Sequence, residues 1–532
     1  MTLNADRTAP RTASAWKPYT RHLSHDIPAG IVVFLVALPL CLGIALASGV
    51  PLLAGLLAGV IGGLLVAVLS GSQLSISGPA AGLVVIVIEA IALLGGFEGF
   101  LTAVLVAGVL QLVLARLRAG DLGAYVPSSV IKGMLAAIGL MLIVKQVPVA
   151  LGHASFSAFD SRIPDDAGLG GMLAQVGGAI SGGTLTVAAV SLALLAIWET
   201  PWARAQRVLR HVPGPLVVVA WGVLYQLVTA HAAPGVALAD EHLVQLPPID
   251  GLASLGAQLV QPDFSQFANP AMYRVAITLA IVASLETLLS VEAVDKLDPM
   301  RRVAPSNREL YAQGAGNIAA GLVGALPLTA VIVRSSANIN AGGRTKVSAM
   351  VHGVLLLLSV LFLSNALRWI PLAALSAILL HVGYKLARPS LFAQAWREGA
   401  SQAVPFIVTV AAILATDLLV GIAIGMAVGI GFTLRSNFHS ALSLTRYEDC
   451  YLLRMHKDVS FFNKARLRHL LARVEPGSKL IIDASRCAWI DHDIEETIAD
   501  FQRSARVTKI DVTFRPMPAR GVPPAVAAAI HT

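Results

Sequence analysis

The stretch QLSISGPAAGLVVIVIEA, residues 73–90, changes character twice within eighteen residues. It begins with an alternating, strand-like LSIS, breaks at Gly78-Pro79, and continues as an apolar run typical of a helix. Hydrocarbon offers no hydrogen-bond partners, so irregular backbone is tolerated in a membrane only where it is buried in protein or lines a cavity. If this stretch lies in a membrane, it therefore indicates a site.

The composition places the stretch in a membrane protein. Of the 532 residues, 56% are hydrophobic and 13% are charged, whereas about a quarter of an average soluble chain is charged. Lys and Arg outnumber Asp and Glu by 39 to 31, an excess that reports loop topology in a membrane protein and predicts no nucleic-acid partner. The three cysteines have neither CxxC nor metal-ligand spacing, so we expect no disulfide and no metal site.

Apolar runs of the length that a bilayer requires, about 20 residues, recur along most of the chain. Thirteen candidates lie near 28–48, 51–69, 77–95, 99–115, 128–147, 172–197, 213–230, 272–292, 312–326, 346–364, 369–383, 403–416 and 418–434. The stretch LTAVIVRSSANINAGGRT, residues 328–345, is too polar for an ordinary span but repeats the pattern of residues 73–90. Counting it predicts fourteen spans. Two interrupted segments at corresponding places predict an inverted repeat of seven plus seven spans, with a binding site between the halves.

The distribution of basic residues predicts the orientation. Lys and Arg follow even-numbered spans, as at Arg116 and Arg118 or at Arg301 and Arg302, and short cytoplasmic loops are enriched in these residues. The loop 231–270 follows an odd-numbered span and contains no Lys or Arg. We therefore expect both termini in the cytoplasm. The first apolar run leads directly into a second span, which argues against a cleaved signal peptide.

The character of the chain changes from about residue 446. Strand and helix patterns then alternate as far as KIDVTFR at 509–515, which is typical of a small α/β domain with a mixed sheet. We expect a cytoplasmic segment at 1–26, a transport domain at 27–437, a linker at 438–445, the α/β domain at 446–517 and a flexible tail at 518–532.

The two interrupted segments predict where a ligand would bind. Pro79 suits the first turn of a helix and Ser77 is a good cap for it, so we expect a helix to begin inside the membrane. Its N-terminus carries about half a positive charge and free N–H donors, which bind anions. The second break, around Arg334-Ser335-Ser336, would aim another helix start at the same depth, and Arg334 would add a full charge. The alternative is two kinks in ordinary packed helices, with Arg334 reaching a lipid headgroup.

A carboxylate within a span, Glu286, is a second candidate. The spacing puts Thr278, Glu286 and Ser290 on one helical face, and an intramembrane carboxylate indicates a functional site. Glu286 could exchange a proton, bind sodium or pair with Arg334. The sequence has no phosphate-binding loop, no Ser/His/Asp arrangement and no metal cluster, so we expect neither an enzyme activity nor a cofactor, and no ATP-driven pumping.

Four motifs together resemble the SulP family of anion transporters. They are DIPAGIVVFLVALPLCLG at 26–43, SISGPAAG at 75–82, SLETLLSVEAVD at 284–295 and VIVRSSANINAGGRT at 331–345, with the α/β tail after them. The resemblance implies a seven-plus-seven inverted repeat divided into core and gate bundles, with broken third and tenth helices. It also implies a cytoplasmic STAS domain, which could contact a regulator, and a homodimer.

The resemblance further implies which residues hold a small inorganic anion, between the starts of the third and tenth helices and the first and eighth helices. The contacts would be Ser77, Gly78 and Ala80 in the third helix and Arg334, Ser335 and Ser336 in the tenth. Glu286, with Ser290, would serve the coupling ion, a proton or sodium. Many relatives have Gln and Tyr after the first-helix proline. This chain has Pro39-Leu40-Cys41 there, which leaves Cys41 as the first-helix candidate.

Two further expectations come from the same resemblance. In the tail, His492 follows Asp491 where related phosphorylated domains have Asp-Ser, so we expect no phosphoswitch at that turn. The ending VEAVDKLDP, 291–299, resembles a bacterial subgroup linked with carbonic anhydrase, which favours bicarbonate. We also expect elevator-type alternating access and a location in a bacterial-type inner membrane. Sulfate, chloride or a dicarboxylate would satisfy the same helix-end site. An uncoupled anion channel, a nucleobase permease and a membrane-anchored regulator are the alternatives.

Overall fold

The computed structural model describes residues 22–516 apart from 121–126, 153–180, 207–211, 234–235, 250, 417, 457, 460–462, 488 and 506–507. Most of the expected N-terminal segment 1–26 and the whole of the expected tail 518–532 lie outside the described residues. The chain forms two compact units, one containing most of the helices and one containing the C-terminal α/β domain. Each unit is described by itself.

A helix overlaps each of the fourteen predicted segments, and several helices extend beyond the predicted bounds. In the first half these are α2 (Leu23–Ala47), α3 (Leu52–Ile61) continued by a π-helical turn and α4 (Ala67–Leu69), α5 (Val84–Leu94), α6 (Phe97–Arg116), α7 (Ser128–Leu151), α9 (Gly182–Trp198) and α11 (Gly214–Ala232). In the second half they are α13 (Pro270–Leu297), α14 (Ser306–Val323), α15 (Ile332–Asn340), α16 (Val347–Phe362), α18 (Leu372–Leu386), α20 (Ala400–Ala415) and α21 (Leu418–Ala441). Six of the described helices are long and apolar enough to cross a membrane: α2, Leu52–Leu69, α6, α7, α11 and α13.

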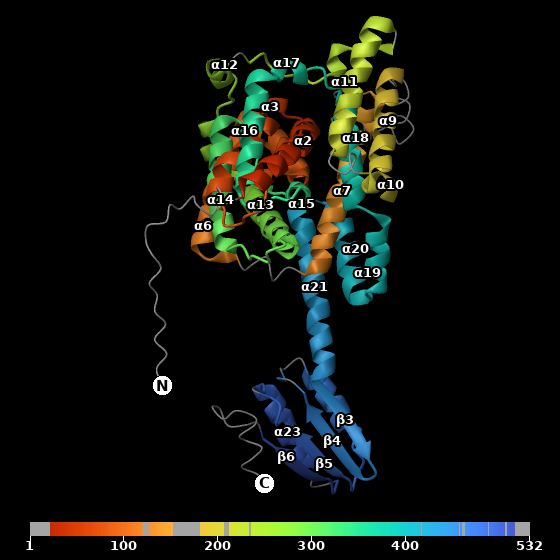
Figure 1. Cartoon of the computed structure of the whole chain (residues 1–532). Coiled ribbons are helices and arrows are strands. Elements are labelled where there is room, and N and C mark those ends of the chain that lie inside the picture. Colours follow the sequence, from red (N-terminus) through yellow and green to blue (C-terminus); the bar gives the residue numbers. More distant parts are fainter. Residues whose placement is uncertain are drawn as a thin grey trace, which may run out of the picture. The chain divides into compact units, whose positions relative to one another are not determined.

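The helices of the first unit pack in two groups, shown in Figure 1. In one group, α6 packs against α13 and α14, and α2 packs against α3, α15 and α16. In the other, α18 packs against α7 and α9, and α9 packs against α11. Because α2 also contacts α11 and α18, it lies where the two groups meet. This division matches the core and gate bundles that the resemblance implies.

Two short strands interrupt the first group and form a small antiparallel sheet. They are β1 (Ser77–Pro79) and β2 (Leu328–Ala330), and Gly78 pairs with Thr329 at the centre. The expected cap at Ser77 is therefore wrong: Ser77 is in a strand, Pro79 ends that strand, and the helix begins at Ala81 with a 3-10 turn that leads into α5. The second helix begins at Ile332, two residues before Arg334. The pairing of β1 with β2 gives hydrogen-bond partners to the backbone of residues 77–79 and 328–330. If the first helix began at Ser77, β2 would lose its partner strand, and hydrocarbon cannot replace it.

The second unit contains the predicted α/β domain. Its mixed sheet has the order β3 (Leu442–Tyr447), β4 (Cys450–Met455), β5 (Lys479–Asp483), β6 (Asp511–Arg515), antiparallel in the first pair and parallel in the other two. The helices α22 (Lys464–Leu471) and α23 (His492–Ala505) bury Leu467, Ile494 and Ile498 in its core. The expected linker 438–445 is instead the end of α21 and the start of β3, because the β3–β4 ladder extends to the pair Leu442–Met455.

Candidate functional site

The irregular backbone of the two broken segments is buried and hydrogen-bonded. The strands β1 and β2 are buried throughout, and Val331 N donates to Ile76 O at 2.9 Å beyond the end of their ladder. On the other edge, the Asn317 amide accepts from Leu328 N at 2.8 Å and donates to Leu328 O at 3.1 Å. Residues 73–90 can therefore lie at membrane depth because residues 328–331 and Asn317 supply the partners that lipid lacks.

Both helix starts that leave this sheet are uncapped. The residues before the first turns are Ala80 and Val331, and no side chain caps either start. The N–H groups of an uncapped first turn lack intrahelical partners and carry the positive end of the helix dipole. The two starts therefore favour negative charge nearby.

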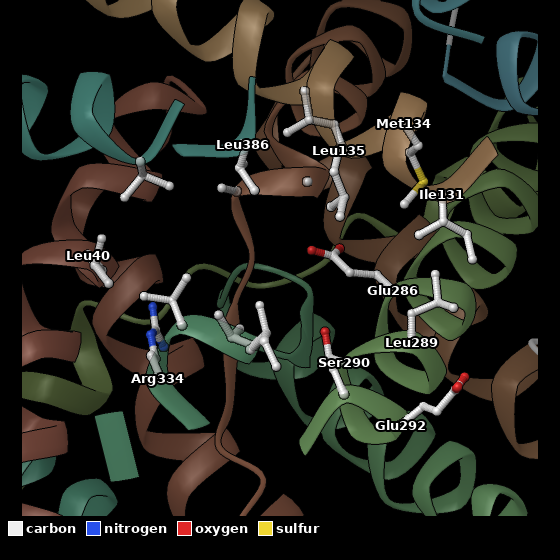
Figure 2. Close-up of a pocket in the computed structure, with 18 of the residues that line it drawn as sticks. Leu40, Ile131, Met134, Leu135, Glu286, Leu289, Ser290, Glu292, Arg334 and Leu386 are labelled. Carbon is white, nitrogen blue, oxygen red and sulfur yellow. The ribbon is translucent and has the colours of Figure 1, made fainter. Parts of the chain in front are cut away.

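A cavity of about 380 Å³ lies in front of these helix starts. Its walls include Ala81 and Gly82 before α5, Val331–Arg334 at the start of α15, and Glu286 and Ser290 of α13. The facing wall is apolar and comes from α2, α7 and α18, with Leu40, Met134, Leu135 and Leu386 among its residues. Figure 2 shows Arg334 and Glu286 on separate sides of this space. Three of the predicted site residues, Arg334, Glu286 and Ser290, thus line one cavity.

Arg334 is a fully buried cation without an anionic partner. Its side chain is 0% exposed, its Nη2 donates to Pro79 O at 3.3 Å, and its Nε and Nη1 have no hydrogen-bond partner. No Asp or Glu among the described residues forms an ion pair with it. A buried charge without a partner carries a desolvation penalty of several kcal/mol. The arrangement therefore favours an anion beside Arg334.

Gly78 makes room for this guanidinium. A Cβ added at Gly78 would lie 2.1 Å from Arg334 Nη1, which is far inside van der Waals contact. The glycine that breaks residues 73–90 therefore lets the cation approach β1.

Glu286 lies beside the start of the helix that contains α5. A Cβ added at Gly82 would lie 2.8 Å from Glu286 Oε1, and Glu286 Oε2 has no hydrogen-bond partner. No ion pair joins Glu286 to Arg334 in the part of the chain that the structure describes, so the two groups are separate features of the cavity. A carboxylate at this place offsets the positive end of α5 when it is ionised and leaves it free when it is neutral.

The remaining predicted contacts lie behind the cavity wall. Ser77 Oγ accepts from Gln313 Nε2 at 2.7 Å. Ser335 Oγ accepts from Ile76 N at 2.9 Å and donates to Val331 O at 2.8 Å. These two serines hold the strand pair together rather than face the cavity.

Three other predicted residues are also outside the cavity lining. Ala80 is buried, Ser336 is partly exposed on α15, and Cys41 is fully buried. Cys41 lies against α3, where a Cβ at Gly59 would be 2.9 Å from its Sγ. From the first helix, Leu40 and Ile44 reach the cavity instead.

Two kinds of site residue were not predicted from the sequence, and only the second kind carries a recognisable pattern. The Leu, Ile and Met residues of α7 and α18 that line the cavity cannot be told from lipid-facing residues in the sequence, because both are simply apolar. Gln313 and Asn317 are different: buried amides four residues apart on α14 are a polar signal inside a span. That signal could have indicated the hydrogen bonds to β1 and β2.

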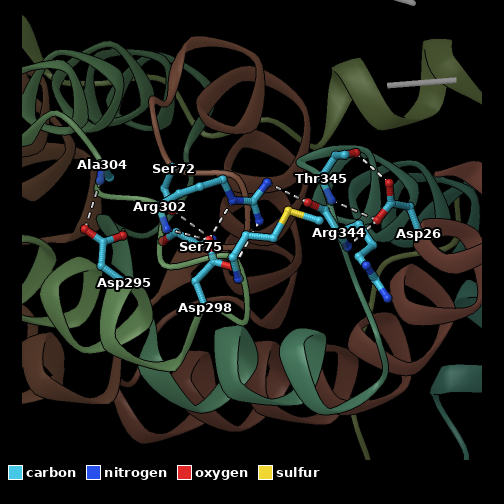
Figure 3. A network of polar contacts seen from close by, with 10 residues as sticks. Asp26, Ser72, Ser75, Asp295, Asp298, Arg302, Ala304, Arg344 and Thr345 are labelled. Atoms are coloured by element: carbon cyan, nitrogen blue, oxygen red, sulfur yellow. Dashed lines mark hydrogen bonds and ion pairs between the residues drawn. The ribbon is translucent and has the colours of Figure 1, made fainter. Parts of the chain in front are cut away.

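A network of charged groups holds the end of α13 to its neighbours, as Figure 3 shows. Arg302 donates to Asp298 through Nε at 2.6 Å and Nη2 at 3.2 Å, and through Nη1 to Arg344 O at 2.9 Å. Asp26 at the start of α2 accepts from Arg344 N at 2.7 Å and from Thr345 N at 3.0 Å. The pKa of Asp298 is lowered: partial burial works against this, but the hydrogen bonds from Arg302 outweigh it.

Comparisons with known proteins decide the family. The model of the sulfate permease family matches residues 23–412. The chain belongs to the sulfate permease family. This confirms the resemblance to SulP transporters, and it makes the chain a multi-pass membrane protein of an anion transporter family rather than an enzyme.

Proteins named as transporters of different anions are similar to this chain. YvdB of Bacillus subtilis, named for sulfate transport, is 28% identical over 80% of this chain and 76% of its own length. The bicarbonate transporter BicA of Picosynechococcus is 27% identical over 77% of this chain and 70% of its own length. The specific anion therefore does not follow from the family.

Solved structures of family relatives share the fold. The transmembrane domain of a cyanobacterial bicarbonate transporter, BicA, matches with a TM-score of 0.62 at 24% identity, over 77% of this chain and 98% of its own. The structure of SLC26A9 matches with a TM-score of 0.75 at 17% identity, over 94% of this chain and 86% of its own. The predicted fold class, a helical membrane transporter with a small C-terminal α/β domain, is confirmed.

Proposed function

We propose that the chain is a secondary active transporter of a small inorganic anion that binds between the starts of α5 and α15, with bicarbonate as the preferred substrate. The observation that carries the proposal is Arg334, a fully buried cation with two unpartnered nitrogens at the wall of a cavity. An anion in that cavity would supply the missing partner of the guanidinium and meet both uncapped helix starts.

The charges around the cavity support coupling to a cation. Each helix start contributes about half a positive charge and Arg334 contributes one, so the site carries about two positive charges without Glu286. An ionised Glu286 reduces that total to about one. A proton or sodium ion that neutralises Glu286 therefore strengthens anion binding, which is the requirement for symport. Such coupling offsets the cost of moving an anion into a negative compartment, about 2.3 kcal/mol per charge per 100 mV.

The division of the cavity walls supports an elevator mechanism. The charged wall comes from α13, α15 and the start of α5, which belong to the first helix group, whereas much of the apolar wall comes from α7 and α18 of the second. An apolar surface makes no directional bonds with the anion. The first group can therefore carry the anion along the second without breaking polar contacts.

Bicarbonate is preferred because of the similarity to BicA and the VEAVDKLDP motif. The alternative within this family is sulfate, which the similarity to YvdB favours and which the site with a neutral Glu286 would accommodate. The assembly expected with either substrate is a homodimer in a bacterial-type inner membrane with both termini in the cytoplasm. We expect the STAS-like domain to lie in the cytoplasm as well, where it could bind a regulator.

Uptake into proteoliposomes tests substrate and coupling together. Labelled bicarbonate and labelled sulfate are offered separately, each with an inward proton gradient and then an inward sodium gradient. The proposal expects one anion to be concentrated under one gradient, and Glu286→Gln to abolish the gradient dependence while anion exchange continues. Fast flux that never exceeds equilibrium would instead indicate a channel and contradict the proposal.

A further inference from the structure

A second cavity of about 260 Å³ lies next to the first. The two cavities share four wall residues: Leu40, Val333, Val382 and Leu386. The second cavity lies at the last turns of α9 and α18, where Glu199 follows α9 and His381 and Lys385 project from α18. Apolar side chains thus separate the substrate cavity from a charged one.

One carboxylate in the wall of the second cavity, Glu199, has three basic neighbours, of which His381 and Lys385 also line the cavity. Glu199 lies 3.1 Å from His381 Nε2 and 3.8 Å from Arg388 Nη2, and it forms an ion pair with Lys385. Two full positive charges and an imidazole therefore share one negative charge. The side chains of Lys385 and Arg388 are 40% and 45% exposed, against 28% for Glu199, so a solute can reach the bases.

We propose that this second cavity is an additional anion-binding site, in which the transported anion takes the place of Glu199 as the partner of Lys385 and Arg388. The inference rests on the proposed function, because it assumes that the anion of the first cavity moves past Leu40, Val333, Val382 and Leu386. The ligand is a small inorganic anion of the class that Arg334 binds.

Glu199 has the properties of a resident counter-ion. Its pKa is lowered: burial works against this, but the hydrogen bond from Lys385 and the charges of Lys385 and His381 outweigh burial. Glu199 is therefore ionised at neutral pH. Exchange of its carboxylate for an incoming anion leaves the bases paired throughout, which avoids the penalty of an unpaired charge. Competition with Glu199 also keeps affinity low, so that an anion arriving from Arg334 is released rather than trapped.

Protection of Lys385 from chemical labelling tests the site without requiring transport. The full-length protein in detergent is treated with an amine-reactive acetylating reagent, with sulfate or bicarbonate replacing gluconate at constant ionic strength, and labelling of each lysine is followed by mass spectrometry. Lys464 is the matched internal control, because it is also paired with a carboxylate, Asp493 at 3.7 Å, and its side chain is 31% exposed. We expect sulfate or bicarbonate to slow labelling of Lys385 severalfold and to leave Lys464 unchanged.

Two variants separate this inference from the proposed function. In Glu199→Gln the competing carboxylate is gone, so protection of Lys385 should appear at a severalfold lower anion concentration. In Arg334→Ala transport should be lost while protection of Lys385 persists. Equal effects on Lys385 and Lys464, absence of protection, or loss of protection in Arg334→Ala would each overturn the second site. Normal transport by Arg334→Ala would instead overturn the proposed function.

Discussion

At the scale of single residues, the site depends on two glycines that bring charged side chains against the backbone. Gly78 admits the Arg334 guanidinium and Gly82 admits the Glu286 carboxylate. Substitutions at these two glycines therefore test the proposed anion binding and the proposed coupling separately, without replacing Arg334 or Glu286.

The first prediction concerns Gly78. A Cβ there would lie 2.1 Å from Arg334 Nη1, so Gly78→Ala should displace the guanidinium and raise the KM for anion uptake at least severalfold. Gly431→Ala on α21 is the matched control, because a Cβ at Gly431 meets nothing within 4 Å. Uptake kinetics in proteoliposomes measure both. Unchanged KM in Gly78→Ala would show that the position of Arg334 does not matter for binding.

The second prediction concerns Gly82. A methyl group there would press on both Glu286 carboxylate oxygens, which lie 2.8 and 2.9 Å from the added Cβ. We expect Gly82→Ala to weaken the dependence of uptake on the driving ion more than it changes anion exchange without a gradient. The ratio of gradient-driven uptake to exchange measures this effect. An equal loss of both rates would indicate a general packing defect instead.

At the scale of elements, the β1–β2 pair is the feature that allows two helices to begin inside the membrane domain. Asn317 of α14 serves both backbone groups of Leu328 and also donates to Gln111 at 2.8 Å. Asn317→Ala leaves buried backbone groups without partners, at roughly 1–3 kcal/mol each. The unfolding midpoint in detergent should fall clearly below that of Asn365→Ala, which changes an exposed asparagine in the short helix α17 (Ser364–Leu367). Equal midpoints would mean that the sheet needs no support from α14.

The network at the end of α13 gives a pH-dependent prediction. Because the pKa of Asp298 is lower in the folded protein than its usual value of 3.8, Asp298 stabilises the fold at pH values above 3.8. That contribution is lost as the pH falls through the lowered folded pKa. Unfolding midpoints measured from pH 6 downward should therefore fall less steeply with acid in Asp298→Asn than in the wild type. Parallel curves would show that the ion pair with Arg302 does not contribute.

At the scale of the whole molecule, local chemistry in the sequence predicted much of the architecture. The fourteen segments, the two breaks, the mixed-sheet domain and the cavity positions of Arg334 and Glu286 follow from apolar length, breaker residues and intramembrane charge. The pairing of residues 77–79 with 328–330 could not be predicted, because three-residue strands about 250 positions apart have no register signal. For the same reason Ser77 was expected as a helix cap, although its partner is Gln313 of a distant helix.

The most direct test of the whole site compares anion uptake by the wild type, Arg334→Ala and Arg334→Lys in proteoliposomes at matched protein density. The buried guanidinium is expected to be the main positive partner of the anion. Arg334→Ala should therefore abolish saturable uptake of bicarbonate and of sulfate, and Arg334→Lys, which keeps the charge but loses the planar fork, should retain part of it. Uptake by Arg334→Ala with wild-type KM and rate would contradict the assignment of this cavity as the anion site.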